Sequence, residues 1–366
     1  MGIPAAWYGT IYVILLGIIT LNVCWQRYSR YSVTRLSNLQ TEAYMPSFIF
    51  AIFITLFIGF RPISGVFMDM GGYAADFMAG RYADMTEFEN FLFDRWRKFL
   101  CVADVDVYVF FVSIAIIYFM GMWVACRMLF PADTTLSFLV CLAAFSTFSY
   151  GTNGIKAGSA MSLFLIAIAL KDRDKKLLTA LFLWLSLGFH HSMILPLCAF
   201  GICMLVKNQK FHYRFWIFCV LMALFHVTAF QSLFASFSEE GHGYITEVSQ
   251  DLWGKRGFRP DFILYSAMPV VVGYFVTKKH HIQDEKYNFI LNLYTFLNAI
   301  WMLCMYANFT NRIAYLSWGI YPVALIYPFL RFEWKSKQYK TASIVAILHW
   351  LFTFFMTTIY YVFIEV

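Results

Sequence analysis

Twelve apolar runs, separated by short charged or turn-rich breaks, constrain the fold of this chain more than any other sequence feature. They fall at residues 6–25, 44–60, 107–126, 135–150, 157–170, 177–189, 192–206, 215–235, 260–277, 287–306, 312–330 and 341–363. In lipid only helices and closed barrels satisfy every backbone polar group, and these runs neither alternate nor are as short as barrel strands. The pattern predicts an all-α, polytopic integral membrane protein. We expect about 12 transmembrane helices in a single transmembrane domain over residues 1–366.

The composition excludes other classes of protein. Hydrophobic residues make up 61% of the chain and charged residues only 13%, whereas a soluble domain has about 25% charged residues. An ordinary soluble enzyme, a disordered chain and a nucleic-acid binder are therefore excluded. The eight cysteines show no Cys-x-x-Cys pair and no metal-ligand spacing, so we interpret them as small side chains buried in the membrane. The sequence also shows no nucleotide-binding motif, and we expect neither a metal nor a cofactor.

The distribution of Lys and Arg predicts how the helices are oriented. With the N-terminus outside, the predicted cytoplasmic loops hold 18 of the 28 basic and 7 of the 21 acidic residues. That side then carries a net charge of +11 and the opposite side −4, which agrees with the excess of positive charge in cytoplasmic loops. We therefore expect both termini on the outer side, together with two longer loops at 61–106 and 236–259.

The stretch 177–206 can form one long helix or two short ones broken at Phe189-His190-His191-Ser192. A single span would reverse every later loop and place more basic residues outside than inside, so the charge rule favours two spans. Each would be about 20 Å long, which is short for a hydrocarbon core of about 30 Å. This predicts that the His-His break is recessed into the membrane from the outer side.

Polar residues that the orientation does not explain gather on the predicted outer side. The first group is Gly59-Phe60-Arg61-Pro62, followed by Asp69 and Tyr73. An arginine directly after an apolar run is either an interfacial side chain or an anion clamp, since its planar fork matches phosphate oxygens. Asp69 is a candidate to orient that fork or a sugar hydroxyl, and Tyr73 to contact a sugar.

The second group is Tyr150-Gly-Thr-Asn-Gly-Ile-Lys156. We expect Asn153 to be the N-cap of an inward-running helix, whose free amides and positive dipole end favour an anion. Lys156 in the first turn would add charge and complete a phosphate cradle. The alternative is plain capping with an interfacial lysine. Tyr150 is a second candidate to contact a sugar.

The third group is the histidine pair. Successive helical residues point about 100° apart, so His190 and His191 cannot serve one role. One is expected to face the outer cavity, where an imidazole is a suitable general base near neutral pH. The other would cap or pack, and a hydrogen-bonded structural histidine is the alternative for both.

Further cations lie at the starts of later helices. Arg256 and Arg259 precede the run at 260–277, and Arg312, with Tyr315 one turn on, opens the run at 312–330. Each cation alone would suit an interface. In the predicted topology these helices run inward, so the cations and the helix N-termini are candidates to bind one anion such as a pyrophosphate.

An acidic pair supports a competing interpretation. Asp104 and Asp106 precede the run at 107–126 on the predicted outer side. Such a pair holds a metal in some membrane glycosyltransferases, although acids before a helix start are also ordinary dipole partners. The alternative enzyme is therefore a polyprenyl-phosphate-sugar-dependent membrane glycosyltransferase with a metal site at Asp104 and Asp106.

The order of these motifs resembles the EpsG family of Wzy-like polysaccharide polymerases. The resemblance rests on Arg61…Asp69-x-x-x-Tyr73, Asn153-Gly-Ile-Lys156, Phe189-His190-x-Ser192 and Arg312. It covers most of the chain. The sequence departs from the family pattern at Lys156-Ala157, where Arg-Gln is expected, and a lysine holds phosphate only as a point charge.

The resemblance implies a glycosyltransferase that joins oligosaccharide repeat units carried on undecaprenyl pyrophosphate into capsule, exopolysaccharide or O-antigen. It would act without a metal at the outer, periplasmic face of the bacterial cytoplasmic membrane. A flippase and a chain-length regulator of the same pathway are candidate partners. His190 would be the catalytic base, and Arg61 and Arg312 would stabilise the departing pyrophosphate. The non-enzymatic alternative is a flippase or transporter, which would need cations along a path across the membrane, and the mid-span positions hold almost none.

Overall fold

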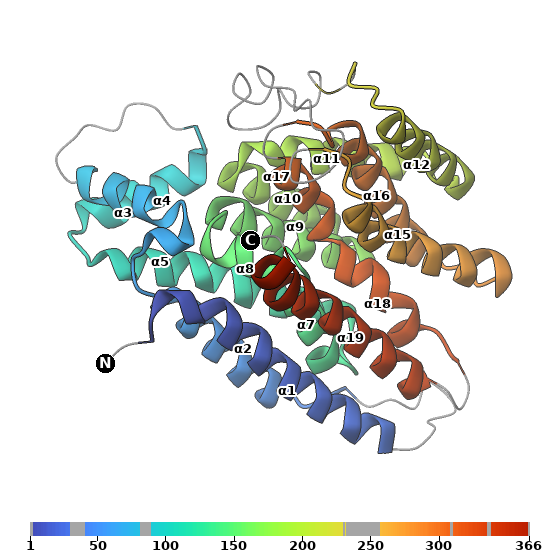
Figure 1. Cartoon of the computed structure of the whole chain (residues 1–366), viewed down its shortest axis with the longest axis horizontal. Coiled ribbons are helices and arrows are strands. Elements are labelled where there is room, and N and C mark those ends of the chain that lie inside the picture. The colour runs from blue at the N-terminus through green and yellow to red at the C-terminus, as the bar shows by residue number, and fades with distance from the viewer. Residues whose placement is uncertain are drawn as a thin grey trace. The chain divides into compact units, whose positions relative to one another are not determined.

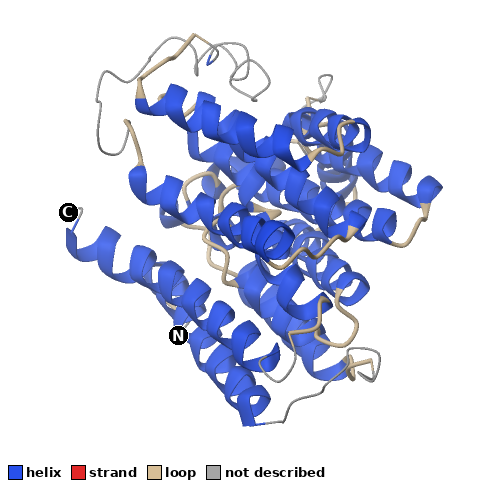
Figure 2. Ribbon diagram, turned by 90° about the vertical axis from the view of Figure 1, so that its right-hand side faces the viewer, coloured by secondary structure: helices blue, strands red, loops and turns tan. Residues whose placement is uncertain are grey.

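The computed structural model describes residues 3–29, 41–80, 89–229, 231, 257–307, 310–334 and 338–364. Within these ranges the regular elements are helical (Figure 2), which confirms the all-α prediction. The chain divides into two compact units, one made of Met1–His190 with Phe329–Val366 and the other of His191–Pro328. The prediction of a single transmembrane domain stays a prediction.

The apolar runs fold as helices of two lengths. Five of the described helices are long and apolar enough to cross a membrane, namely Ala5–Arg27, Val107–Leu129, Pro260–Lys279, Thr310–Arg331 and Tyr339–Ile359. Shorter apolar helices lie at Met45–Gly59, Lys176–Phe189 and His191–Leu205. This pattern fits a membrane protein and confirms the break in the 177–206 stretch. The total of 12 spans and the outer placement of the termini stay predictions.

The first unit contains helices from both ends of the chain (Figure 1). They are α1 (Tyr8–Ser29), α2 (Met45–Gly59), α3 (Met70–Ala79), α4 (Phe91–Val102), α5 (Val107–Ala115), α6 (Gly121–Leu129), α7 (Thr134–Leu142), α8 (Thr147–Thr152), α9 (Ile155–Asp172), α10 (Lys176–Phe189) and α19 (Gln338–Phe354). A π-helical turn at Ile116–Met120 joins α5 to α6, and a π-helical segment at Phe355–Ile364 continues α19. The helices α1 and α19 lie side by side.

Helix α9 is the centre of the first unit, because α6 and α10 pack along it and nearly all of its residues are buried. Small residues allow the close approach. Ser162 Oγ donates to the carbonyl of Ile117 at 2.8 Å, and Ser186 Oγ of α10 donates to the carbonyl of Ala160 at 2.7 Å. A Cβ on Gly121 would lie 2.9 Å from Ser162 Oγ. Small residues and interhelical hydrogen bonds of this kind hold helices together where lipid removes the hydrophobic driving force.

The apolar run at 135–150, predicted as one span, is two helices. α7 ends at Leu142 and α8 begins at Thr147, so the carbonyls of residues 140–143 reach a helix end. Each accepts a side-chain hydrogen bond. The donors, in the order of these carbonyls, are His349 at 3.1 Å, Thr147 at 2.6 Å, Tyr12 at 2.8 Å and Thr353 at 2.7 Å. Broken helices are tolerated at membrane depth when neighbours satisfy the freed backbone groups in this way.

The second unit is built around α16. Its described helices are α11 (Ile194–Leu205), α12 (Gln209–Leu224), α15 (Pro260–Tyr274), α16 (Glu285–Leu303), α17 (Thr310–Trp318) and α18 (Tyr321–Arg331), the last of which contains the unit boundary. α11, α12, α15 and α17 all contact α16. The aromatic core includes Trp318, whose Nε1 donates to Ser266 Oγ at 2.8 Å. The buried Tyr294 hydroxyl donates to the carbonyl of the same serine at 2.7 Å.

The loop predicted at 61–106 contains two helices that the apolar runs did not indicate. They are α3 and α4, which contact each other. α4 is amphipathic, with Phe93, Leu100 and Cys101 buried, and Phe91 and Phe99 exposed. The described parts of this loop, 61–80 and 89–106, are therefore folded parts of the first unit.

Candidate functional site

Arg61 is buried just beyond the end of α2, with 1% of its surface exposed. Its Nη1 atom donates to the carbonyl of Ile58 at 2.9 Å, and Nη2 donates to the carbonyl of Thr152 at 2.8 Å. The Cζ atom lies 5.3 Å from the ring centroid of Phe111 and 5.5 Å from that of Phe67. Two carbonyls and two aromatic rings thus fix the guanidinium.

The charge of Arg61 is not neutralised by any carboxylate within 4.0 Å in the part of the chain that the structure describes. Its buried Nε also has no hydrogen-bond partner there. Burial lowers the pKa of Arg61 to about 10, so the side chain stays protonated at neutral pH. A buried cation without a counter-ion is costly. It therefore supplies a positive potential that would favour an anion nearby.

The second motif has a different backbone from the one predicted. Asn153 is not the N-cap of α9, because residues 147–152 already form α8 and Asn153 caps the C-terminus of that helix. The N-cap of α9 is Gly154. The buried Oδ1 of Asn153 has no hydrogen-bond partner among the described residues. Asn153 directly follows Thr152, whose carbonyl oxygen accepts the hydrogen bond from Arg61 Nη2.

Tyr150 is an interior residue with 3% of its surface exposed. Its ring meets Tyr118 edge to face at 6.4 Å. A Cβ on Gly158 of α9 would lie 2.7 Å from the carbonyl oxygen of Tyr150, so only glycine fits at that position without a shift. The structure gives Tyr150 a packing role between α8 and α9. The predicted sugar contact would need the site to open.

Lys156 and Tyr73, 83 positions apart in the sequence, are brought together. Lys156 Nζ lies 5.9 Å from the ring centroid of Tyr73 on α3 and 6.0 Å from that of Phe93 on α4. The two rings meet edge to face at 6.0 Å. Asp69 occupies the N-cap position of α3, and its carbonyl accepts from Tyr73 N at 3.0 Å. The first and second motifs are therefore joined twice, by Arg61 with Thr152 and by Tyr73 with Lys156.

Phe93 is a contact of Lys156 that the predictions did not include. The sequence did contain a signal for helix α4, because Phe93, Trp96 and Leu100 repeat at helical spacing among charged residues. Such a pattern predicts an amphipathic helix, although it does not indicate what the helix packs against.

The two histidines fall on the unit boundary. His190 ends the first unit in extended conformation, with φ −156° and ψ 120°, and is 8% exposed. His191 begins the 3-10 turn His191–Met193 of the second unit and is half-buried. Because His190 is extended and not helical, the 100° spacing of helical residues does not apply to the pair, and separate roles for the two imidazoles stay a prediction.

The later cations lie in the second unit and have individual surroundings. Arg259 donates to both carboxylate oxygens of Asp261, at 3.0 and 2.7 Å, and its Cζ lies 3.9 Å from the ring centroid of Phe262. An internal carboxylate thus neutralises this arginine, which weakens it as an anion clamp. Arg312 and Tyr315 are half-buried on α17, where the Tyr315 ring packs at 5.6 Å from Trp318. Arg256 lies outside the described residues.

Asp106 acts as a helix cap. Its side chain accepts from Tyr108 N at 2.7 Å at the start of α5. Asp104 has a left-handed backbone, with φ 51°, in the turn between α4 and α5. Over the described ranges no three His, Cys, Asp or Glu side chains group closely enough to hold a metal ion. The pair therefore has the ordinary geometry of a turn and a cap.

The sequence matches the EpsG family over residues 44–364, which include every candidate residue above. The chain belongs to the EpsG family. The resemblance inferred from the ordered motifs is thereby confirmed, and EpsG membership indicates a glycosyltransferase-like polysaccharide polymerase in general. No curated protein and no solved structure matches the chain.

Proposed function

We propose that this EpsG protein joins oligosaccharide repeat units carried on undecaprenyl pyrophosphate, at the outer face of the bacterial cytoplasmic membrane. The product would be a surface polysaccharide such as capsule, exopolysaccharide or O-antigen. The observation that carries the proposal is the buried, unneutralised Arg61, tied through Thr152 to the segment that bears Lys156. A pyrophosphate is the kind of anion that such cations favour.

The two cations have different roles in the proposal. The half-buried Lys156 contacts the departing pyrophosphate directly. Arg61 donates its Nη hydrogens to two carbonyl oxygens and does not contact the pyrophosphate directly. It adds positive potential near the pyrophosphate and keeps the junction of α8 and α9 in place. Asn153 lies between them in the sequence and has a buried oxygen suited to accept a sugar hydroxyl. Arg312, which belongs to the second unit, stays a prediction of the family pattern.

The proposed step is a glycosyl transfer without a metal. The acceptor hydroxyl oxygen forms a bond to the anomeric carbon of the donor chain, while the bond from that carbon to the pyrophosphate oxygen breaks. His190 accepts the hydroxyl proton as general base. The electron pair leaves with the lipid pyrophosphate, where the cationic side chains stabilise the developing charge.

The test uses the full-length protein with lipid-linked repeat units in detergent, where no translocation is needed. We expect polymer from the native chain, which would exclude a pure flippase or transporter. His190→Ala should keep insertion and substrate binding but lose elongation, whereas His280→Ala, at an exposed position, should elongate normally. Undiminished polymer length in His190→Ala would remove His190 as the base.

The metal-dependent alternative predicts different results in the same assay. It requires loss of activity in a chelator, and an inactive Asp104→Asn variant beside an active His190→Ala variant. Full activity in the chelator would instead favour the proposal. Neighbouring genes for a flippase and a chain-length regulator would support the proposed pathway.

A further inference from the structure

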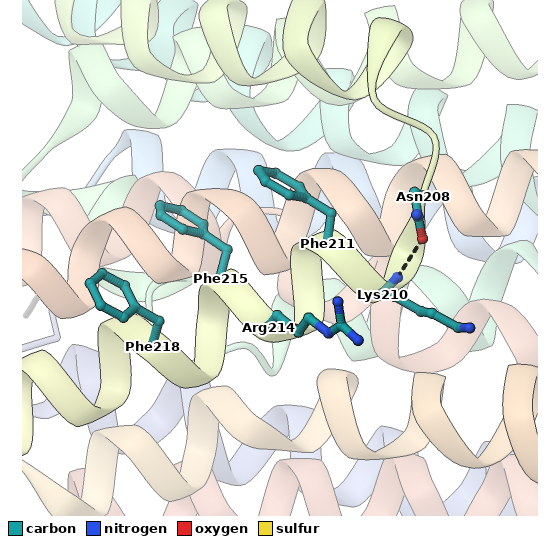
Figure 3. Close-up of a pocket in the computed structure, with 6 residues that line it drawn as sticks. All are labelled: Asn208, Lys210, Phe211, Arg214, Phe215 and Phe218. Carbon is teal, nitrogen blue, oxygen red and sulfur yellow. Dashed lines mark hydrogen bonds between the residues drawn. The ribbon is translucent and has the colours of Figure 1, made fainter.

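Helix α12 of the second unit carries a groove on one side. Its lining residues are Asn208, Lys210, Phe211, Arg214, Phe215 and Phe218, around a volume of about 470 Å³ (Figure 3). Lys210 and Arg214 lie at the N-terminal end of the helix, and the phenyl rings continue along it (Figure 3). The groove thus has two cations near its N-terminal end beside a longer row of phenyl rings.

The two cations of the groove are exposed and one helical turn apart. In the described part of the chain no carboxylate lies within 4.0 Å of either. The nearby Lys207 differs, because its Nζ lies 3.7 Å from Glu285. Like charges at this spacing on a helix repel each other, so an anion between them would be stabilising.

The phenyl rings form a row with two exposed members, Phe211 and Phe218, while the half-buried Phe215 also stacks on Phe296 of α16 at 5.2 Å. Phe211 and Phe215 stack with centroids 6.2 Å apart and ring planes 3° apart, and Phe211 and Phe218 are 45% and 47% exposed. Phe218 lies two turns beyond Phe211, about 10 Å along the axis. The opposite side of α12 is occupied, because Trp216 Nε1 donates to Asn298 of α16 at 2.8 Å.

We propose that this groove binds an anionic phospholipid of the surrounding bilayer. The phosphate lies between Lys210 and Arg214, and an acyl chain lies along Phe211, Phe215 and Phe218. The arrangement matches an amphiphile, since the two cations and the row of phenyl rings line neighbouring sides of one groove. The Lys and Arg bias predicts that residues 207–214 face the cytoplasm, where anionic lipids attract basic segments. The proposal is independent of the polymerase activity.

The experiment measures binding of phosphatidylglycerol and phosphatidylcholine to the full-length protein in detergent, by native mass spectrometry. A cation near anionic lipid contributes roughly fivefold in affinity. Lys210→Gln with Arg214→Gln should therefore weaken phosphatidylglycerol binding about 25-fold. Phosphatidylcholine should bind weakly both to the native protein and to the double variant. Phe218→Ser should weaken the binding of phosphatidylglycerol without affecting the thermal unfolding temperature.

The matched control is Lys175→Gln with Lys176→Gln. These two lysines are also exposed, lie on the same predicted side, and change the net charge equally. Phosphatidylglycerol binding should be unchanged in the control. An equal loss in both double variants would overturn the proposal, because surface charge alone would then explain the binding. Displacement of the lipid by inorganic phosphate at equal concentration would also overturn it, because the acyl chain would contribute nothing.

Discussion

Arg61 Nη2 donates a 2.8 Å hydrogen bond to the carbonyl oxygen of Thr152, 91 positions further along the chain. The bond links the loop after α2 to the junction of α8 and α9. The first two motifs of the family pattern therefore depend on each other structurally, and a change at Arg61 will displace the turn that leads to Lys156.

Arg61→Lys should reduce polymerisation although it keeps the charge. The single ammonium of lysine lacks the planar guanidinium with which Arg61 donates to the carbonyl oxygens of both Ile58 and Thr152. Loss of one hydrogen bond to a charged group costs about 1.5–3 kcal/mol, which is roughly 10- to 150-fold in rate if it acts on the transition state. Polymer yield in proteoliposomes measures this effect. Arg95→Lys, at an exposed position on α4, is the control, and native yield from Arg61→Lys would contradict the role.

Lys156→Gln should slow elongation by roughly the same 10- to 150-fold, since the direct cation to the pyrophosphate is lost. Lys156→Arg should retain most activity or exceed the native rate, because its guanidinium can bind phosphate oxygens in pairs. Steady-state elongation rates at saturating lipid-linked donor measure both. Lys176→Gln removes an exposed lysine from α10 and should have no effect. Equal rates for all three variants would exclude Lys156 from the transition state.

Gly158→Ala should destabilise the protein by about 1–3 kcal/mol, the usual cost of overpacking. The added Cβ would lie 2.7 Å from the Tyr150 carbonyl, so α8 and α9 must separate. Gly201→Ala is the matched control, because nothing lies within 4 Å of the added Cβ on α11. It should be neutral or slightly stabilising. Thermal unfolding in detergent distinguishes the two, and similar midpoints would show that the junction can relax.

Thr353→Val should destabilise the interrupted helix pair α7 and α8. It removes the donor to the carbonyl of Ala143 while keeping the shape of the side chain. Interhelical hydrogen bonds in membrane proteins average about 0.6 kcal/mol, with a maximum near 1.7. Thr357→Val is the control, because that hydroxyl bonds only within its own helix, to the carbonyl of Thr353. A larger loss of stability in Thr357→Val than in Thr353→Val would contradict this account.

Local sequence pattern predicted the all-helical class but not α3 and α4, and it predicted the interruptions unevenly. The break at His190 was visible because polar residues interrupt an apolar run. The break after Leu142 was hidden, because Ala143 and Ala144 are as compatible with lipid as the residues around them. Its carbonyls are satisfied by side chains up to 210 positions away, and a local pattern cannot show such partners.

The candidate site was predictable in its residue types more than in its partners. Arg61 and Lys156 were identified because cations beside apolar runs are costly. Their surroundings could not be predicted, because Thr152 is distant in sequence from Arg61, and Phe93 is distant from Lys156. Arg259 was predicted to bind an anion, but the carboxylate of Asp261, two positions further on, already binds it. This neighbour is visible in the sequence.

Lys156 extends from α9 of the core but contacts Tyr73 and Phe93, which belong to the two helices of the loop at 61–106. Because α3 and α4 are packed helices of the first unit, an exchange of this segment must preserve their buried faces, which include Phe77 and Phe93. Within that limit, substitutions at the exposed positions of α3 and α4 would alter the surroundings of Lys156, while α9 and the hydrogen bonds that hold Arg61 stay the same.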